Sequence, residues 1–466
     1  MSGSERWGWT APRCHVTLGR MRDPESGGDS GIPRSEVQRG AERPTRPAMS
    51  ESLASSAVAR PLWRNRDFML LWSGQVVSTV GMRVTTLAYP LLVLALTGSP
   101  FQAGLVGFAQ TLPFLVLYLP AGALVDRLDR RHVMLAADGV RAVLLGLVVL
   151  ALAVDRLSVA ALLAVVFIDG ACFVFFQLAE SAALPHIVPR HQLPAAVAQN
   201  QARELGADLA GRPLGGALFA AGHILPFVAD LLSYVLGFLA MLFVRPGLQS
   251  RSDVDQGRRG LLADISEGLV WLWHQRLMRA LVALTGAVNL VLSALTLVMI
   301  VRAQELGASP SLIGVMLALP GGTAIAGAFA APWLHRRLRP PTVVIGSLWL
   351  WACGTAVLMW LTSPLALGAV VAVTALAEPA FNVVVTSYRY ALAPDRLQAR
   401  AVSAARLITW GAVPLASLAA GGLLQSLGAR GTLVAYAVFM VVLAAVVTTL
   451  PVIRQAPRTE EIPRPE

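Results

Sequence analysis

Long apolar stretches, separated by short polar segments, account for most of the chain. A helix needs about 20 predominantly apolar residues to cross the hydrocarbon core of a bilayer, and these stretches reach that length. Inside a bilayer only helices and closed barrels satisfy the backbone hydrogen bonds, and the stretches are too long for barrel strands. The pattern therefore predicts an all-α membrane protein with twelve transmembrane helices, at 68–97, 102–124, 132–154, 157–182, 194–221, 225–245, 278–302, 311–334, 342–362, 365–391, 400–425 and 430–452.

The longest polar gap, residues 246–277, divides the stretches six and six. This predicts an N-terminal six-helix bundle at 61–245 and a C-terminal six-helix bundle at 278–452, joined by a cytoplasmic linker. The second part of the linker has apolar residues at helical spacing, which indicates an amphipathic helix on the membrane face, with a solvated linker helix as the alternative. These apolar residues are Leu261, Ile265, Leu269, Leu272 and Trp273.

The two ends of the chain lack such stretches. Residues 1–60 are rich in Gly, Pro, Ser and Arg without an apolar period, so we expect a disordered tail, and we expect a second one at 453–466. The first tail has no apolar core of a signal peptide and does not resemble a cleaved export signal. Met49 opens a second plausible start, MSESLASS.

Charge is scarce and unevenly placed. Charged residues make up 14% of the chain, against about 25% in soluble domains. The formal net charge is +11, and every basic residue is an arginine. Arginine clusters follow the even-numbered stretches, and the odd-numbered ones are followed by few, which predicts a multi-pass cell-membrane protein with both termini in the cytoplasm. The positive charge is then topological, so no nucleic-acid partner is expected, and the cysteines have no metal-like spacing.

The connection after the second stretch, GALVDRLDRRHVML at 122–135, carries a spaced pattern of glycine, acid and paired bases. It resembles motif A of the major facilitator superfamily, and the matching residues are Gly122, Asp126, Arg127, Arg130 and Arg131. A glycine permits close helix approach, and an acid suits the positive end of a neighbouring helix. In that family motif A is a latch that stabilises the outward-facing state, so the resemblance implies this role here. It also implies the fold of the family, with two six-helix pseudo-repeats.

Further segments extend the resemblance. The corresponding place in the second half keeps Gly327, Arg336 and Arg337 but lacks the acid. The segment GRPLGG resembles motif C, which is associated with antiporters, although Arg212 stands where proline is expected. Its matching residues are Gly211, Pro213, Gly215 and Gly216. The stretches at 229–234, 264–281 and 387–400 are similar to exporters of the transmembrane secretion effector type, the branch related to enterobactin efflux proteins.

Four polar residues lie near the middle of stretches 1, 4, 7 and 10, which line the central cavity in proteins of this fold. They are Arg83, Asp169, Asn289 and Glu378. An ionisable side chain at that depth costs about 2.5–3.5 kcal/mol on insertion scales and marks a functional candidate. We predict that these residues face a water-filled cavity and that Asp169 or Glu378 binds and releases a proton. The alternative is a fixed structural ion pair between Arg83 and either acid.

Other charges within the stretches favour a structural role. Glu204, Asp208 and Arg212 are spaced by four and share one helix face, and Asp138 shares a face with Arg141. Such groups commonly lock helices together within one half of a transporter. We therefore expect them to hold helices together or to complete the network around motif A.

Together these features predict a secondary transporter, not an enzyme. It would export a small amphipathic or hydrophobic molecule, such as a drug, siderophore or secondary metabolite, by alternating access. The proton gradient would supply the energy, no cofactor is expected, and the partners would be the substrate and the lipid bilayer, with a monomer implied by the resemblance. An importer on the same fold remains an alternative. A membrane sensor or enzyme is disfavoured because the sequence has no nucleotide-binding loop and no HExxH motif.

Overall fold

The structure is a computed structural model, and it describes residues 62–245, 261–394, 397–458 and 461. The predicted N-terminal tail and the first part of the predicted linker lie outside these residues. The described part is helical and contains no strand. The all-α membrane fold predicted from the apolar pattern is therefore confirmed.

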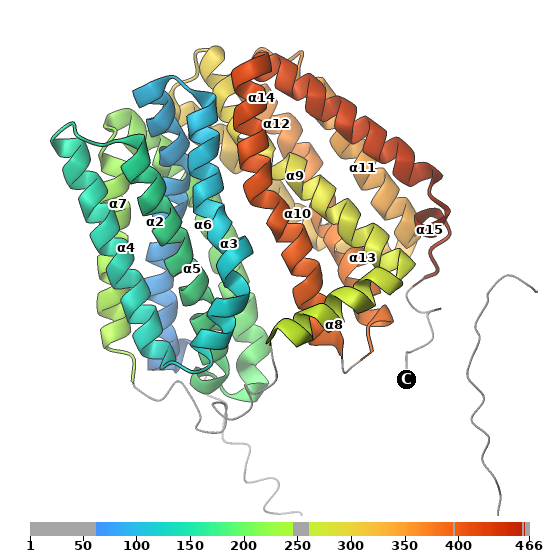
Figure 1. Ribbon diagram of the computed structural model, residues 1–466, viewed down its shortest axis with the longest axis horizontal. Coiled ribbons are helices and arrows are strands. Elements are labelled where there is room, and N and C mark those ends of the chain that lie inside the picture. The colour runs from blue at the N-terminus through green and yellow to red at the C-terminus, as the bar shows by residue number, and fades with distance from the viewer. Residues whose placement is uncertain (1–61, 246–260, 395–396, 459–460, 462–466) are drawn as a thin grey trace, which may run out of the picture. The chain divides into compact units, whose positions relative to one another are not determined.

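The first half of the chain forms six long helices after a short 3₁₀ turn, Leu62–Arg64. α2 contacts α6 and α7, α4 contacts α5 and α7, and α3 contacts α5 (Figure 1). Four of the helices begin where a side chain of Asn65, Ser99, Asp129 or Ser158 accepts a hydrogen bond from the first turn, as N-caps do. The helices are α2 (Arg66–Thr97), α3 (Pro100–Val125), α4 (Arg130–Ala153), α5 (Val159–Ile187), α6 (Leu193–Ala221) and α7 (Leu225–Leu242).

The second half begins with a short helix, and its long helices contain two breaks. α12 ends at Ala375 because Pro379 has no N–H to donate to the carbonyl of residue 375. α14 contains Gly428 with a φ of 68°, so two helices meet there without a loop. The helices are α8 (Leu261–His274), α9 (Arg276–Glu305), α10 (Pro310–Arg337), α11 (Pro340–Leu358), α12 (Pro364–Ala375), α13 (Ala377–Leu392), α14 (Gln398–Thr449) and α15 (Pro451–Arg454).

Among the described residues, 10 segments are long and apolar enough to cross a membrane. α12 and α13 count as one of them, and α14 counts once although Gly428 divides it. α6 is not included, because it carries four charged residues in its middle turns. With α6 added and α14 divided, the arrangement is consistent with the twelve predicted crossings.

α8 occupies the place where the amphipathic helix is predicted. It packs against α14 and α9, and Glu267 forms an ion pair with Arg400 of α14. Leu272 is buried, but Trp273 is exposed, so these two predicted members of one apolar face point in different directions. Farther along, Ile453 is buried and the hydroxyl of Tyr388 donates to the carbonyl of Pro457, 2.7 Å away. The first residues of the segment predicted as a C-terminal tail therefore pack against the helices.

The two halves approach most closely where glycines face each other. A Cβ on Gly104 of α3 would lie 2.7 Å from the Cα of Gly421 of α14, and one on Gly314 of α10 would lie 2.5 Å from the carbonyl oxygen of Arg212 in α6. A Cβ on Gly216 would likewise meet the backbone of Gly314, at 3.1 Å from its Cα. Both crossings lie toward the ends of the helices that carry the α2–α3 and α9–α10 turns. We call Gly104, Gly421, Gly216 and Gly314 the glycine seal.

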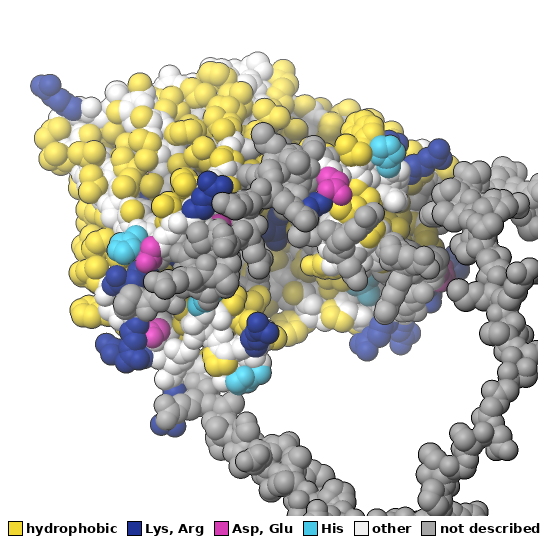
Figure 2. All heavy atoms as spheres, turned by 60° about the horizontal axis from the view of Figure 1, so that its bottom comes forward, with side chains coloured by type: hydrophobic (Ala, Val, Ile, Leu, Met, Phe, Trp, Pro, Cys, Tyr) yellow, Lys and Arg dark blue, Asp and Glu magenta, His cyan; other side chains and the backbone are white. Residues whose placement is uncertain are grey.

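The opposite end of the molecule differs in surface chemistry. Figure 2 brings this end forward and shows apolar side chains over the flank, with arginine and histidine side chains gathered toward the forward face. A flank of apolar side chains is what a lipid-facing surface requires.

Candidate functional site

A cavity of about 610 Å³ lies between helices of the first half and α14 of the second half. Its walls combine charged, amide and aromatic side chains. The lining residues with polar or aromatic side chains are Arg83, Thr86, Gln110, Thr111, Phe114, Tyr118, Arg141, Asp169, Phe173, Gln177, Gln201, Glu204, Ser403, Arg406 and Trp410. Most of them lie on the half of each helix away from the glycine seal. The four glycines of the seal are not among the lining residues, so the cavity lies mainly toward the other end of the helices.

An ion pair between α4 and α5 forms one wall of the cavity. Nε of Arg141 donates to Oδ1 of Asp169 at 2.9 Å, and the two side chains are 4% and 10% exposed. The guanidinium of Arg141 also lies over the ring of Tyr234, 4.2 Å from its centroid, and 5.5 Å from that of Phe173. Such packing holds the arginine in one place, because a cation is attracted to aromatic faces in a desolvated site.

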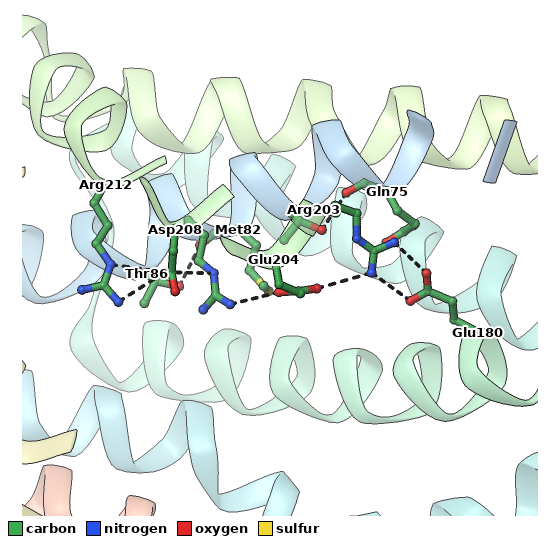
Figure 3. Close-up of polar contacts among 10 residues, drawn as sticks. Gln75, Met82, Thr86, Glu180, Arg203, Glu204, Asp208 and Arg212 are labelled. Carbon is green, nitrogen blue, oxygen red and sulfur yellow. Dashed lines mark hydrogen bonds and ion pairs between the residues drawn. The ribbon is translucent and has the colours of Figure 1, made fainter. Parts of the chain in front are cut away.

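A chain of ion pairs runs along α6 (Figure 3). Consecutive nitrogen–oxygen distances are 3.2, 3.4, 3.1, 3.3 and 2.7 Å. Its members, which we call the ion-pair chain, are Arg212, Asp208, Arg83, Glu204, Arg203 and Glu180 in that order. Nη1 of Arg212 continues it into the second half by donating to the carbonyl of Leu317 in α10, 3.1 Å away. The chain therefore joins α2, α5 and α6 and touches the other half at one end.

Two glycines of the motif C-like segment place Arg83 in this chain. A Cβ on Gly211 would lie 2.5 Å from the Cβ of Arg83, and one on Gly215 would lie 2.8 Å from the carbonyl oxygen of Val84. Their absent side chains let α2 lie directly against α6, so the guanidinium of Arg83 reaches both Glu204 and Asp208. The next residues face the other way, because Pro213 and Gly216 lie against Gly314 of α10. The segment 211–216 thus packs on both halves.

The structure brings two of the four predicted cavity residues together. Arg83 and Asp169 both line the cavity. Asn289 does not, because its Nδ2 donates to the carbonyl of Thr409, 3.0 Å away, in the turn that Pro414 interrupts. Glu378 is exposed at the start of α13 and is not among the lining residues. In this conformation Asn289 and Glu378 do not line this cavity, so the convergence of all four residues on one cavity stays a prediction.

The alternative, an ion pair of Arg83 with Asp169 or Glu378, is not formed among the described residues in this conformation. Arg83 pairs with Glu204 and Asp208, while Asp169 pairs with Arg141. The sequence analysis assigned Glu204, Asp208 and Arg141 a structural role only. It did not predict that Arg141, Glu204 and Arg406 line the cavity. A usable signal was present, since Ser403, Arg406, Trp410 and Val413 repeat every three or four residues on one face of α14.

The motif A residues hold the start of α4 against its neighbours within the first half. Nη1 of Arg130, a buried residue, donates to the carbonyl of Ala182 at the end of α5. Arg131 donates from Nη2 to the carbonyl of Leu242 at 2.8 Å and from Nε to that of Val244 at 3.1 Å, at the end of α7. Asp129, where the family often has glycine, is the N-cap of α4.

Other expectations for motif A differ from the structure. A Cβ on Gly122 would have no neighbouring atom within 4 Å, so the close helix approach expected at this glycine is absent from this conformation. Asp126 and Arg127 are exposed. The outward-state latch remains a prediction.

We expect Arg131→Ala to lower the free energy of unfolding by about 1–2 kcal/mol, because two carbonyls lose a charged donor. Thermal unfolding of the purified protein would measure this. Arg127→Ala is the matched control, since Arg127 is exposed and its side chain forms no ion pair or hydrogen bond in the described ranges. Equal effects of the two substitutions would contradict the anchoring role of Arg131.

Comparisons with known proteins extend these observations. A family model described as transmembrane secretion effector matches residues 56–465. The multidrug efflux pump Tap of Mycolicibacterium fortuitum is 28% identical over 406 residues, which cover 83% of this chain and 96% of that protein. Macrolide efflux protein A of Streptococcus pyogenes is 25% identical over 216 residues, which cover 46% of this chain and 53% of that protein. The more specific resemblance to enterobactin efflux proteins remains a prediction.

Solved structures share the fold at low identity. The nucleoside transporter NupG superposes with a TM-score of 0.67 at 12% identity, over 82% of this chain and 98% of that one. A bacterial homologue of ferroportin in its inward-facing state gives a TM-score of 0.61 at 15% identity, over 82% of this chain and 99% of that one. Its outward-facing state with soaked iron gives 0.53 at 18% identity, over 82% and 98%. From the family match and this shared fold, the chain belongs to the transmembrane secretion effector family of the major facilitator superfamily.

Proposed function

We propose that this chain is a secondary active transporter that exports small amphipathic or hydrophobic molecules, including drug-like ones. The cavity of about 610 Å³ at the junction of the two halves carries the proposal. Its volume lies in the range of about 300–1,000 Å³ typical of small-molecule sites, and its lining combines aromatic rings with charged and amide groups that can orient a ligand. The names of the multidrug and macrolide efflux relatives support the same substrate class.

We also propose that the structure is the inward-facing state in the cell membrane, with both termini in the cytoplasm. The positive-inside rule supports placing the arginine-rich end of the helices in the cytoplasm. The glycine seal then closes the extracellular end, and the cavity lies toward the cytoplasm. The higher TM-score with the inward-facing ferroportin homologue, 0.61 against 0.53, agrees with this assignment.

For the coupling step we propose the pair of Asp169 and Arg141. A carboxylate that pairs with an arginine in one conformation and loses that partner in another changes its proton affinity during the cycle. Asp169 touches the cavity and is paired with Arg141 in this state, which supports the proposal. The proton gradient would supply the energy without a cofactor, and a monomer would suffice because one chain encloses the cavity.

Dye efflux tests the proposal. Cells expressing the protein are loaded with ethidium, N-phenyl-1-naphthylamine or 1-anilinonaphthalene-8-sulfonate, and we expect faster loss of at least one dye than in non-expressing cells. A protonophore should abolish the difference. Accumulation in place of loss would favour the importer, and no difference with any dye would contradict transport of amphipathic molecules.

Proteoliposomes test the coupling residue. We expect Asp169→Asn to lower proton-driven efflux at least about tenfold while exchange of labelled for unlabelled substrate continues, because exchange needs no net proton movement. Glu378→Gln is the matched control and should retain proton-driven efflux, since Glu378 does not line the cavity. Loss of coupling in Glu378→Gln alone would assign the proton to that acid.

A further inference from the structure

The charged groups of the cavity are not balanced. Two acids line it, and both are already paired: Asp169 with Arg141 at 2.9 Å, and Glu204 with Arg83 at 3.1 Å. Glu204 also accepts from Arg203 at 3.3 Å. Neither acid is therefore available to a cationic substrate unless an existing ion pair opens.

Arg406 is a third lining arginine, and it enters from α14 on the opposite wall. It is exposed, and its guanidinium forms no ion pair or hydrogen bond within the described part of the chain. With three arginines and two acids, the lining carries a formal charge of +1. A cation at this depth is costly without water or a counter-ion, so an anion entering the cavity would gain a partner here.

Aromatic rings lie next to this cation. Trp410 follows Arg406 by four residues, so both project from one face of α14. The ring of Trp410 is stacked with that of Phe114 at 6.3 Å between centroids, and Phe114 lies 5.5 Å from Phe173. The three rings form an apolar surface across the junction of the two halves. A flat apolar molecule would bury its area against them.

We propose that the cavity binds anionic amphipathic molecules, with the carboxylate, sulfonate or phenolate of the substrate on Arg406 and its ring system on Trp410 and Phe114. This inference rests on the proposed transport function and narrows its substrate class. A planar guanidinium binds such oxyanions through two parallel hydrogen bonds, which gives orientation as well as affinity. Three glutamines of the lining, Gln110, Gln177 and Gln201, offer amide groups for further contacts.

Binding of two matched probes to the full-length protein in nanodiscs tests this. The probe 1-anilinonaphthalene-8-sulfonate is an anion, and N-phenyl-1-naphthylamine is the same skeleton without the sulfonate. Energy transfer from tryptophan, corrected with empty nanodiscs, gives the dissociation constants. We expect Arg406→Gln to weaken sulfonate binding about tenfold, which is about 1.4 kcal/mol, and to change binding of the neutral probe less than about twofold.

Two further variants sharpen the test. Arg406→Lys keeps the charge without the planar donor pair, so we expect a smaller loss of about threefold for the sulfonate. Arg430→Gln removes an exposed arginine beyond Gly428 in the same helix, outside the cavity lining, and should leave both probes unaffected. Retained binding of the neutral probe also reports that the Arg406 variants are folded.

The outcomes separate the two proposals. If Arg406→Gln weakens both probes equally, or neither, the anion site is overturned even where dye efflux persists. Tighter binding of ethidium than of the sulfonate to the unmodified protein would also overturn it, because a cation would then be preferred. If no dye is transported but the sulfonate binds through Arg406, the anion site stands and transport of such molecules fails.

Discussion

Asp169→Asn is expected to lower the free energy of unfolding by about 3–5 kcal/mol, because it leaves the guanidinium of Arg141 buried without its partner. Arg141 is 4% exposed, and its guanidinium lies over the rings of Tyr234 and Phe173, so little of it reaches water in this conformation. Thermal unfolding of the purified protein in one detergent would measure the loss. Glu378→Gln removes an acid that has no ion-pair partner among the described residues, so it should not lower the stability.

The double variant Arg141→Met and Asp169→Leu distinguishes stability from coupling. Replacing both members of a buried pair by apolar residues is often neutral or stabilising. We therefore expect the double variant to recover most of the lost stability but not proton-driven efflux. A double variant as unstable as Asp169→Asn alone would contradict the view that the unpaired Arg141 causes the loss.

Gly216→Ala is expected to open the glycine seal. The added Cβ would overlap the backbone of α10 at Pro310 and Gly314. Overpacking of this kind costs about 1–3 kcal/mol, which would lower the equilibrium ratio of sealed to open states about 5- to 150-fold and slow transport.

Cross-linking measures this shift. Ser99 and Gln425 form a hydrogen bond between the halves at 3.0 Å, at the same end as the seal. With Ser99→Cys and Gln425→Cys in a background without the native cysteines, Gly216→Ala should reduce cross-linking strongly. Gly206→Ala is the control on the same helix, because a Cβ there meets no atom within 4 Å. Unchanged cross-linking in Gly216→Ala would show that the crossing does not limit closure.

The sequence predicted the helices better than it predicted which side chains meet. Apolar length located the membrane helices, since every turn inside a bilayer must be apolar or paired. The depth of a residue could also be read, because it follows from its position along the helix. Its rotation about the helix axis could not be read in the same way. Asp169 and Glu378 lie near the middle of their stretches, yet Asp169 lines the cavity and Glu378 does not.

The choice of ion-pair partner was likewise beyond the sequence. Arg83 had several acids at similar depth, and the packing of α2 on Gly211 and Gly215 decided that it meets Glu204 and Asp208. The same glycines were assigned to a family motif without a packing role. Arg406 lies near the start of an apolar stretch, where an arginine can equally extend to the headgroups, and only the structure places it in the cavity wall.

The chemistry of the glycine seal has a consequence for leakage of protons. The atoms that meet at the two crossings belong to backbone and small side chains. The residues are Pro100, Phe101, Gly104, Ser417 and Gly421 at one crossing and Arg212, Pro213, Gly216, Pro310 and Gly314 at the other, and none of them has a carboxyl or imidazole side chain. In the proposed orientation, acidifying the outside medium would neither charge this barrier nor loosen it. Protons would then cross the membrane only during a complete transport cycle. The proton gradient would therefore be maintained when no substrate is being transported.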